Sequence, residues 1–226
     1  MVLQLIKKKS AESLTVDSLR NAITTGQLAA GQRITEASLS ESFGVSRGTV
    51  RIALYQLMQE GIVVQTPYTG WAVMQLTPRD VWELYTLRAS LESLSAKLAG
   101  DQIDAKGKRQ LSKAFDDLMK ACDKGVRADV AAADFELHRT IVEMAQHSRL
   151  SAHYQLVEQQ FKIFLLASTY TSTRIEGTIS DHQPIVDAIL AGNGQLAAQL
   201  TQQHNIAGGD RLYGVLQESA ANSAAS

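Results

Sequence analysis

Apolar residues in the first sixty positions recur with the period of short helices. Val16, Leu19 and Ile23 lie about one helical turn apart. A second helix is predicted over 35–44 and a third over 46–61, because each of these segments begins at a Thr or Ser that can cap a helix and ends at a glycine. Almost no chain separates them, so the pattern predicts a helix-turn-helix.

The spacing of apolar residues changes after Gly61. Ile62–Val64 and Trp71–Met74 are rich in residues that favour strands, and they flank a Pro-Tyr-Thr-Gly segment that ends at Gly70. We therefore expect a two-stranded hairpin. Three helices followed by a hairpin are the order of a winged helix, whose third helix enters the major groove of DNA.

From Thr77 onward every pattern is helical. Thr77-Pro78 is a typical helix start, and the leucines after it alternate three and four residues apart, which predicts a helix buried along one side. These leucines are Leu84, Leu87, Leu91, Leu94 and Leu98. Further helical patterns follow without a strand pattern between them, so we expect an antiparallel-like bundle of six or seven helices.

The predicted fold is therefore mainly α, with two domains and a tail. Residues 1–77 form a winged helix-turn-helix and residues 78–218 form an all-helical bundle. Residues 219–226, which are all Ala, Ser or Asn, are expected to be disordered. The bundle is expected to build ligand sites from side chains that face its interior.

Charge is distributed unevenly between these parts. Residues 1–79 carry 8 Lys and Arg against 5 Asp and Glu, and the remainder carries 14 against 18, which gives net charges of +3 and −4. A DNA-facing module needs such a local positive field. No stretch approaches the roughly 18 to 20 apolar residues that cross a bilayer, and the single Cys122 forms no internal disulfide. We expect a cytoplasmic protein without a membrane partner.

Two arginines at the start of the third predicted helix are candidates for DNA binding. Arg47 and Arg51 lie one turn apart, and the planar fork of Arg binds either phosphate oxygens or the edge of guanine. Ser46 and Thr49 could add hydroxyl contacts to phosphate. Such a pair is usually only a solvated helix surface, but the surrounding pattern favours DNA binding. Gly70 either serves only the turn or lets the wing approach the minor groove closely.

The histidines of the predicted bundle favour a metal site. Asp134 and His138 are four residues apart and share a helix face, while His182 and His204 share faces with apolar residues of two other helices. Each histidine alone could be an ordinary buried residue bonded to backbone or carboxylate. Several buried imidazoles without a common purpose are costly, however, so a shared metal site is the better interpretation. Three imidazoles and a carboxylate suit zinc, nickel or manganese.

The segment AGQRITEASLSESFGVSRGTVRIALYQLMQEGIVVQTPYTGWAV resembles the DNA-binding domain of the GntR family, in the branch whose regulatory domain is called FCD. This resemblance implies that Arg47, Thr49 and Arg51 contact the operator and that Arg33 and Gly70 help to grip the DNA backbone. It also implies a homodimer, as two-fold proteins commonly bind palindromic half-sites.

The chain departs from the family's pattern at a few of these positions. The family usually has Pro before Val50 and Glu after Arg51, where this chain has Thr49 and Ile52, and the wing residue before the glycine is Thr69. These differences bear on the operator sequence more than on the ability to bind DNA.

Two later segments, ADFELHRTIVEMAQHSRL and DHQPIVDAILAGNGQLAAQLTQQH, are similar to the metal-binding members of the FCD group. Those members show Asp-x-x-x-His followed by two further histidines on later helices. Asp134, His138, His182 and His204 match this pattern one for one.

The same resemblance bears on an effector. Arg88 matches an Arg-x-x-x-Glu pattern with Glu92, so Arg88 is a candidate clamp for the carboxylate of a small acid, with a buried structural pair as the alternative. His147 stands where many members carry an Asn facing the effector pocket; it either alters effector choice or is exposed near a helix end, and the latter is slightly favoured. His153 has no matching role.

These features together predict a transcriptional regulator, more often a repressor, that binds double-stranded operator DNA as a homodimer. A small carboxylic acid at the metal site would modulate its affinity for DNA. Two alternatives remain at this stage. The metal could be purely structural or itself the signal, or the Asp and His set could belong to a metal-dependent hydrolase, for which we find no convincing general base. We therefore expect that the protein is not an enzyme.

Overall fold

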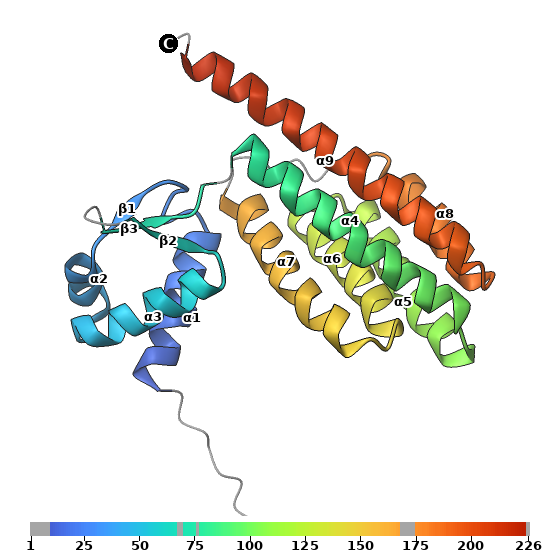
Figure 1. Cartoon of the computed structure of the whole chain (residues 1–226), viewed down its shortest axis with the longest axis horizontal. Helices are drawn as coiled ribbons and strands as arrows, with labels where there is room; N and C mark the ends of the chain where they lie inside the picture. The colour runs from blue at the N-terminus through green and yellow to red at the C-terminus, as the bar shows by residue number, and fades with distance from the viewer. Residues whose placement is uncertain (1–9, 67–69, 76, 168–174, 225–226) are drawn as a thin grey trace, which may run out of the picture. The chain divides into compact units, whose positions relative to one another are not determined.

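The computed structural model describes residues 10–66, 70–75, 77–167 and 175–224 (Figure 1). The tip of the predicted wing, which includes Thr69, and residues 225–226 of the predicted tail lie outside these ranges. The chain divides into two compact units, one of Met1–Gln75 with Gln159–Tyr170 and one of Leu76–Glu158 with Thr171–Ser226. The sequence places all of 159–170 in the bundle, so the first unit is larger than a simple N-terminal domain.

The first unit contains the predicted winged helix. Three helices and three strands follow one another, and the strands form one antiparallel sheet in the order β1, β3, β2. These elements are α1 (Ala11–Thr24), β1 (Arg33–Ile34), α2 (Glu36–Phe43), α3 (Arg47–Gln59), β2 (Val63–Thr66) and β3 (Gly70–Val73). The sequence predicts only two strands, because β1 is two residues long and has too few positions to show an alternating pattern.

Helix caps fix where the two helices of the helix-turn-helix begin and end. The side chains of Thr35 and Ser46 each accept a hydrogen bond from a backbone N–H three residues later, which fixes the starts of α2 and α3. Gly44 ends α2 in the left-handed conformation with φ of 64°, which a glycine adopts without strain. Leu54 and Leu57 of α3 are then fully buried against the rest of the unit.

Six helices follow within the described residues, in agreement with the predicted bundle, and all of them lie in the second unit except the part of α7 from Gln159 onward, which belongs to the first unit. They are α4 (Pro78–Asp101), α5 (Ala105–Lys124), α6 (Arg127–Met144), α7 (Ser148–Ala167), α8 (Thr178–Leu190) and α9 (Gly194–Ala224). Thr77 and Asp80 form a reciprocal capping box at the start of α4, with Pro78 in the first turn, as the sequence predicts. A continuous core of apolar side chains joins α4, α5, α6, α8 and α9.

The buried face of α4 differs from the prediction. Leu87 and Leu94 are 50% and 44% exposed, and Leu84, Leu91 and Leu98 are only partly buried. The residues that face inward are mostly polar or small: Val81, Arg88, Ala89, Glu92, Ser95, Ala96, Ala99 and Gly100.

Close packing of α4 against α9 explains this difference, and Figure 1 shows the two helices side by side. A Cβ on Gly100 would lie 2.8 Å from the Cα of Gly194, so only glycine fits at this contact. A face of leucines would hold the two backbones further apart.

The last helix is longer than expected. The sequence predicts disorder from residue 219, but α9 continues to Ala224. The residues beyond 218 include several alanines, and alanine has the highest helix propensity of all residues, so these positions extend a helix that is already formed.

Candidate functional site

Three histidines from three helices meet inside the bundle. His138 lies on α6, His182 on α8 and His204 on α9, and a possible ligand atom of each lies within 4.8 Å of the others. The ring centroids of His182 and His204 are 4.3 Å apart, and that of His138 is 5.1 and 5.4 Å from them. His138 and His182 are buried and His204 is partly buried. The helical spacing of each residue therefore brings the imidazoles to one point.

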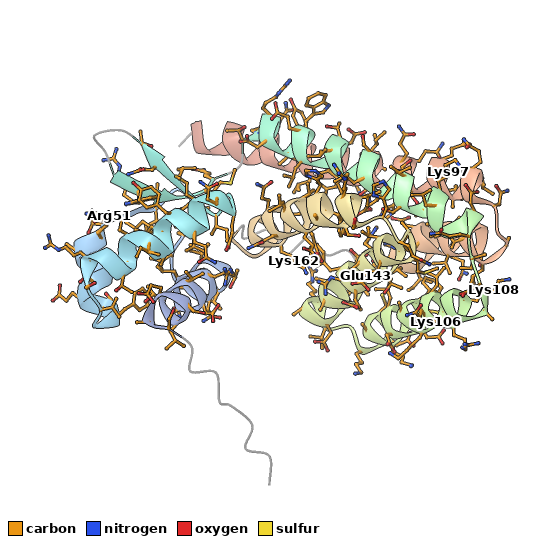
Figure 2. The ribbon with its side chains drawn as sticks, turned by 60° about the horizontal axis from the view of Figure 1, so that its bottom comes forward. Arg51, Lys97, Lys106, Lys108, Glu143 and Lys162 are labelled. Atoms are coloured by element: carbon orange, nitrogen blue, oxygen red, sulfur yellow. The ribbon has the colours of Figure 1, made fainter. Side chains whose placement is uncertain are left out.

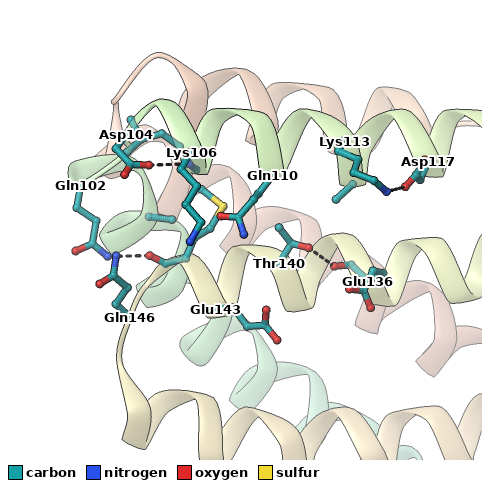
Figure 3. A pocket seen from close by; sticks show the side chains of 15 residues that line it. Gln102, Asp104, Lys106, Gln110, Lys113, Asp117, Glu136, Thr140, Glu143 and Gln146 are labelled. Atoms are coloured by element: carbon teal, nitrogen blue, oxygen red, sulfur yellow. Dashed lines mark hydrogen bonds and ion pairs between the residues drawn. The ribbon is translucent and has the colours of Figure 1, made fainter.

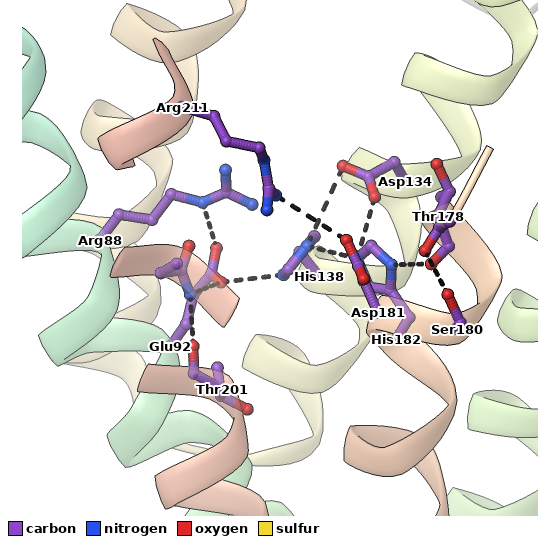
Figure 4. A network of polar contacts seen from close by, with 12 residues as sticks. Arg88, Glu92, Asp134, His138, Thr178, Ser180, Asp181, His182, Thr201 and Arg211 are labelled. Carbon is purple, nitrogen blue, oxygen red and sulfur yellow. Dashed lines mark hydrogen bonds and ion pairs between the residues drawn. The ribbon is translucent and has the colours of Figure 1, made fainter. Parts of the chain in front are cut away.

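Asp134 reaches the same point from α6. Its Oδ1 lies 3.0 Å from the Nε2 atom of His182, and its Oδ2 lies 4.0 Å from the Nε2 atom of His138 (Figure 4). The four residues that the sequence singles out as metal ligands are thus brought together by the fold.

Hydrogen bonds on the far side of two rings orient their Nε2 atoms toward the centre of the cluster. The Nδ1 atom of His138 lies 2.8 Å from a carboxylate oxygen of Glu92, and the Nδ1 atom of His182 lies 2.7 Å from the backbone oxygen of Thr178. Each Nδ1 therefore donates its proton outward, and the two Nε2 atoms, which are 3.1 Å apart, face each other. Ligating histidines in metal sites are held in this way.

Two groups of the cluster, Asp134 and His204, are held in the protonation states that bind a cation. Burial opposes the charge of Asp134, but a hydrogen bond and the charge of His182 hold the pKa of Asp134 below its ordinary value. Burial together with the neighbouring His182 and His138 lowers the pKa of His204 to about 2, so its imidazole is neutral. Burial opposes the charge of His182, but its hydrogen bond with Asp134 raises the pKa of His182, so a divalent metal, which binds neutral imidazoles, would have to displace a proton there.

A buried ion pair lies directly behind His138. The Nε atom of Arg88 is 2.6 Å from Oε1 of Glu92, and the two residues are 5% and 1% exposed. Oε2 of Glu92 accepts a second hydrogen bond from the side-chain amide of Asn205 at 2.8 Å. The structure thus shows the structural pair that the sequence offers as the alternative role of Arg88, and the assignment of Arg88 to an effector stays a prediction.

A pocket of about 220 Å³ between α8 and α9 reaches the cluster from outside. Its lining includes His204, Asp181 and Arg211, and the last two form an ion pair at 3.8 Å. A larger pocket of about 570 Å³ lies between α5 and α6, where Lys106 and Glu143 line it (Figure 3). None of the four clustered residues lines that larger pocket. A cavity of about 10 Å³ lined by His138 and His182 lies at the cluster itself, and the pocket beside His204 is the roomier of these two and opens outward.

The predicted DNA-contacting residues lie on α3 and on the adjoining sheet. Arg47 and Arg51 are exposed on α3, and Thr49 is partly buried. Ser46 is the N-cap of α3, since its Oγ accepts from the backbone N–H of Thr49 at 3.1 Å. Its first role is therefore structural, and a phosphate contact would be additional.

Two further predicted DNA contacts lie in the sheet. Arg33 is exposed on β1, where it pairs with Ala72 of β3. Gly70 is the exposed first residue of β3, with φ of 91°, a conformation that favours glycine. Both positions lie in the same unit as α3.

The two other histidines lie away from the cluster. His147 is exposed, and its Nδ1 accepts a hydrogen bond from the backbone N–H of Leu150 at 3.2 Å, at the start of α7. His147 is therefore an exposed residue at a helix end, which is the reading that the sequence slightly favours. His153 is exposed on α7.

Sequence reasoning misses the partners of the predicted site residues. Glu92 is recognised only as the partner of Arg88, and its contact with His138 joins two helices far apart in the chain. Thr178 contributes a backbone oxygen, for which no side-chain signal exists. The contacts of Glu36 with Arg51 and Trp71 also leave no pattern in the sequence, because both partners are distant from Glu36 along the chain.

Two family models match the chain in agreement with this architecture. A model described as "Bacterial regulatory proteins, gntR family" matches residues 13–73, and one described as "FCD domain" matches residues 83–207. The first covers the winged helix, and the second covers most of the helical bundle and all four clustered residues.

Individual proteins show the same similarity over almost the whole chain. The HTH-type transcriptional regulator YdhC of Bacillus subtilis is 26% identical over 207 residues, which cover 91% of this chain and 92% of YdhC. The HTH-type transcriptional repressor GlaR of Escherichia coli is 24% identical over 201 residues, which cover 82% of this chain and 88% of GlaR. A GntR transcriptional regulator from Rhodococcus sp. RHA1 has a similar fold, with a TM-score of 0.73, 22% identity and coverage of 91% and 99%.

The winged helix and the bundle thus define a DNA-binding transcriptional regulator. The chain belongs to the GntR family, with an FCD domain as its C-terminal unit. Its relatives are regulators and not enzymes, as the sequence predicts, so the hydrolase alternative is set aside. Within the described residues no helix has the length and apolar character needed to cross a membrane.

Proposed function

We propose that this regulator is a homodimeric repressor whose affinity for operator DNA changes when a small carboxylic acid binds at a metal ion in the FCD domain. The observation that carries the proposal is the convergence of Asp134 and the three histidines, with the Nδ1 atoms of His138 and His182 held from behind. The relative GlaR is described as a repressor, which supports the sign of the regulation. The protein would act in the cytoplasm, where bacterial DNA lies.

Asp134, His138, His182 and His204 would hold the metal. Zinc, nickel and manganese all accept imidazole nitrogen and carboxylate oxygen, and four protein ligands leave positions for water or for a ligand oxygen when the metal adopts a higher coordination number. The metal would supply a fixed positive charge to which a carboxylate binds.

A small acid has a route to this position. The pocket of about 220 Å³ beside His204 is lined by Arg211, whose planar guanidinium is suited to a carboxylate. Arg88 is a second candidate, as its charge lies next to Glu92 at the far side of the cluster. An acid bound by the metal and by either arginine would prefer one arrangement of α8 and α9, which is the requirement for an allosteric signal.

The exposed leucines of α4 support the homodimer. Leu87 and Leu94 lie two helical turns apart with the partly buried Leu91 between them, so they form a narrow apolar stripe along α4. Glu83 and Lys97 lie toward opposite ends of the same side of α4, where they form ion pairs with Arg79 and Asp101 of the same helix (Figure 2 labels Lys97). Two copies of α4 packed in opposite directions would bring Glu83 of one copy near Lys97 of the other.

Removal and return of metal tests the proposal. The chelated full-length protein is reloaded with zinc, nickel or manganese, and bound metal is measured by elemental analysis together with the melting temperature. We expect one metal ion per chain, a higher melting temperature, and a further rise with at least one member of a panel of mono-, di- and tricarboxylic acids. His182→Ala should abolish stoichiometric metal binding, whereas His153→Ala, at an exposed histidine outside the cluster, should leave it unchanged.

The results of this experiment distinguish the remaining hypotheses on the role of the metal. A rise in melting temperature with metal but with no acid would support a structural metal. A change in DNA affinity on metal binding alone would make the metal itself the signal. Full metal content in both His182→Ala and His204→Ala would exclude the proposed ligand set.

A further inference from the structure

The carboxylate of Glu36, at the start of α2, forms hydrogen bonds with Arg51 of α3. Oε1 and Oε2 of Glu36 accept hydrogen bonds from Nε and Nη2 of Arg51 at 2.8 and 2.6 Å, which is a two-point contact. Oε1 also lies 3.4 Å from Nε1 of Trp71. Glu36 thus connects the start of α2 with α3 and with strand β3.

The surroundings of Glu36 fix its position. Its side chain is 20% exposed, while that of Arg51 is 57% exposed, so the carboxylate lies beneath the guanidinium. Trp71 is buried, and its ring meets that of Tyr55 edge-on with a centroid distance of 5.2 Å. The hydrogen bonds from Arg51, followed by that from Trp71, outweigh burial and keep the pKa of Glu36 below its ordinary value, so the pair is charged at neutral pH.

The geometry leaves a defined part of the guanidinium for DNA. Glu36 takes the Nε and Nη2 side of Arg51, which leaves the edge between the two Nη atoms without a contact to Glu36 on a side chain that is 57% exposed (Figure 2 labels Arg51). Two parallel N–H groups on that edge match the O6 and N7 acceptors of guanine in the major groove.

Charge argues against a phosphate contact by the same arginine. The paired side chains have almost no net charge together, so they would release few counterions from the DNA backbone. The remaining N–H groups of Arg51 can still donate hydrogen bonds to the edge of a base, where recognition depends on geometry more than on net charge.

We propose that Glu36 is a positioning residue for DNA recognition, which presents Arg51 to a guanine edge in the major groove and withholds it from phosphate. This inference rests on the DNA-binding function of the family, and it assigns sequence specificity to a residue that need not touch DNA.

A selection followed by salt titration tests the assignment. The full-length protein first selects sites from a pool of random double-stranded DNA, and the selected duplex is then compared with duplexes in which single guanines are replaced. We expect one guanine whose replacement weakens binding of the unaltered protein by roughly 5- to 150-fold, the range given by one bidentate base contact. Glu36→Gln and Arg51→Lys should each lose most of this preference.

The dependence of binding on salt distinguishes base reading from phosphate binding. Arg51→Lys should keep the slope of log affinity against log salt, and Glu36→Gln should keep it or make it steeper, because it frees a positive charge. Melting temperatures verify that Glu36→Gln remains folded, and the exposed Arg51→Lys gives a second variant that does not disturb the core.

Two results would overturn the proposal. One is unchanged guanine preference in both variants. The other is an Arg51→Ala variant that binds all duplexes equally weakly and has a slope flatter by about 0.9, as expected for a lost phosphate contact. If the unaltered protein selects no duplex at all, the DNA-binding function itself fails, which is a distinguishable result.

Discussion

The contact between Glu92 and its neighbours shows how single residues stabilise charge inside the bundle. Glu92 is 1% exposed and interacts at once with Arg88, His138 and Asn205. Burial opposes its charge, but Arg88 and His138 hold its pKa well below the ordinary value. The desolvation of such a pair offsets much of the attraction, so the pair is expected to add little net stability while its disruption is costly.

Removal of one partner of this pair should therefore destabilise the protein strongly. Glu92→Ala leaves the guanidinium of Arg88 buried without its main counter-charge and should lower the free energy of unfolding by about 3 to 5 kcal/mol. Urea unfolding of the metal-free protein, followed by circular dichroism, measures the loss. The double variant Arg88→Met with Glu92→Leu should lose clearly less, and an equal loss in both would contradict the argument.

The residues of the metal cluster could be predicted from sequence because helical spacing decides which way a side chain points. Asp134 and His138 share a face at i and i+4, and His182 and His204 lie among apolar neighbours. The hydrogen-bond partners could not be predicted in the same way. The contacts of His138 with Glu92 and of Arg51 with Glu36 depend on the packing of helices that no local pattern specifies.

At the scale of the elements, caps and glycines made the helix starts and ends predictable. Ser46, Thr77 and Gly44 act at the expected positions, since each satisfies or ends the backbone hydrogen bonds of its helix locally. Periodicity was less reliable in α4, because it shows that a face is apolar and not what covers that face. The small residues opposite α9 and the polar residues near His138 determine which side of α4 is buried.

The stripe on α4 leads to a prediction for the homodimer. Leu87→Lys combined with Leu94→Lys introduces charges into the proposed contact between two copies and should convert the dimer to a monomer at micromolar concentration. Sedimentation equilibrium gives the mass in solution. Leu196→Lys, at a leucine of similar exposure on α9, is the matched control and should remain dimeric.

A result in which the double variant and the control have the same dimer mass would exclude α4 as the dimer contact. Far-UV circular dichroism must show the same helix content in all three proteins, since Leu87 and Leu94 are already half exposed and their replacement removes little buried surface. A lower melting temperature in the double variant alone is expected when the dimer is lost.

In the whole molecule, the DNA-binding part and the proposed effector-binding part of the chain carry opposite net charges. The first 79 residues have a net charge of +3 and the remainder a net charge of −4, so the positive field is confined to the part that meets DNA. The acidic remainder would bind the proposed acid only where a metal or a local arginine reverses the field. The proposed metal would thus make the effector site locally positive, in addition to fixing the position of the bound acid.

Thermodynamic linkage gives the final prediction. If an acid changes the affinity for operator DNA by some factor, the DNA must change the affinity for that acid by the same factor, typically 5- to 150-fold. Both dissociation constants are measured with the metal-loaded protein at one salt concentration, with and without the other ligand. Because both effects depend on the proposed metal, His182→Ala should remove both of them. The variant should keep the DNA affinity that the unaltered protein has without acid. An effect of the acid on DNA binding that survives in this variant would place the effector elsewhere.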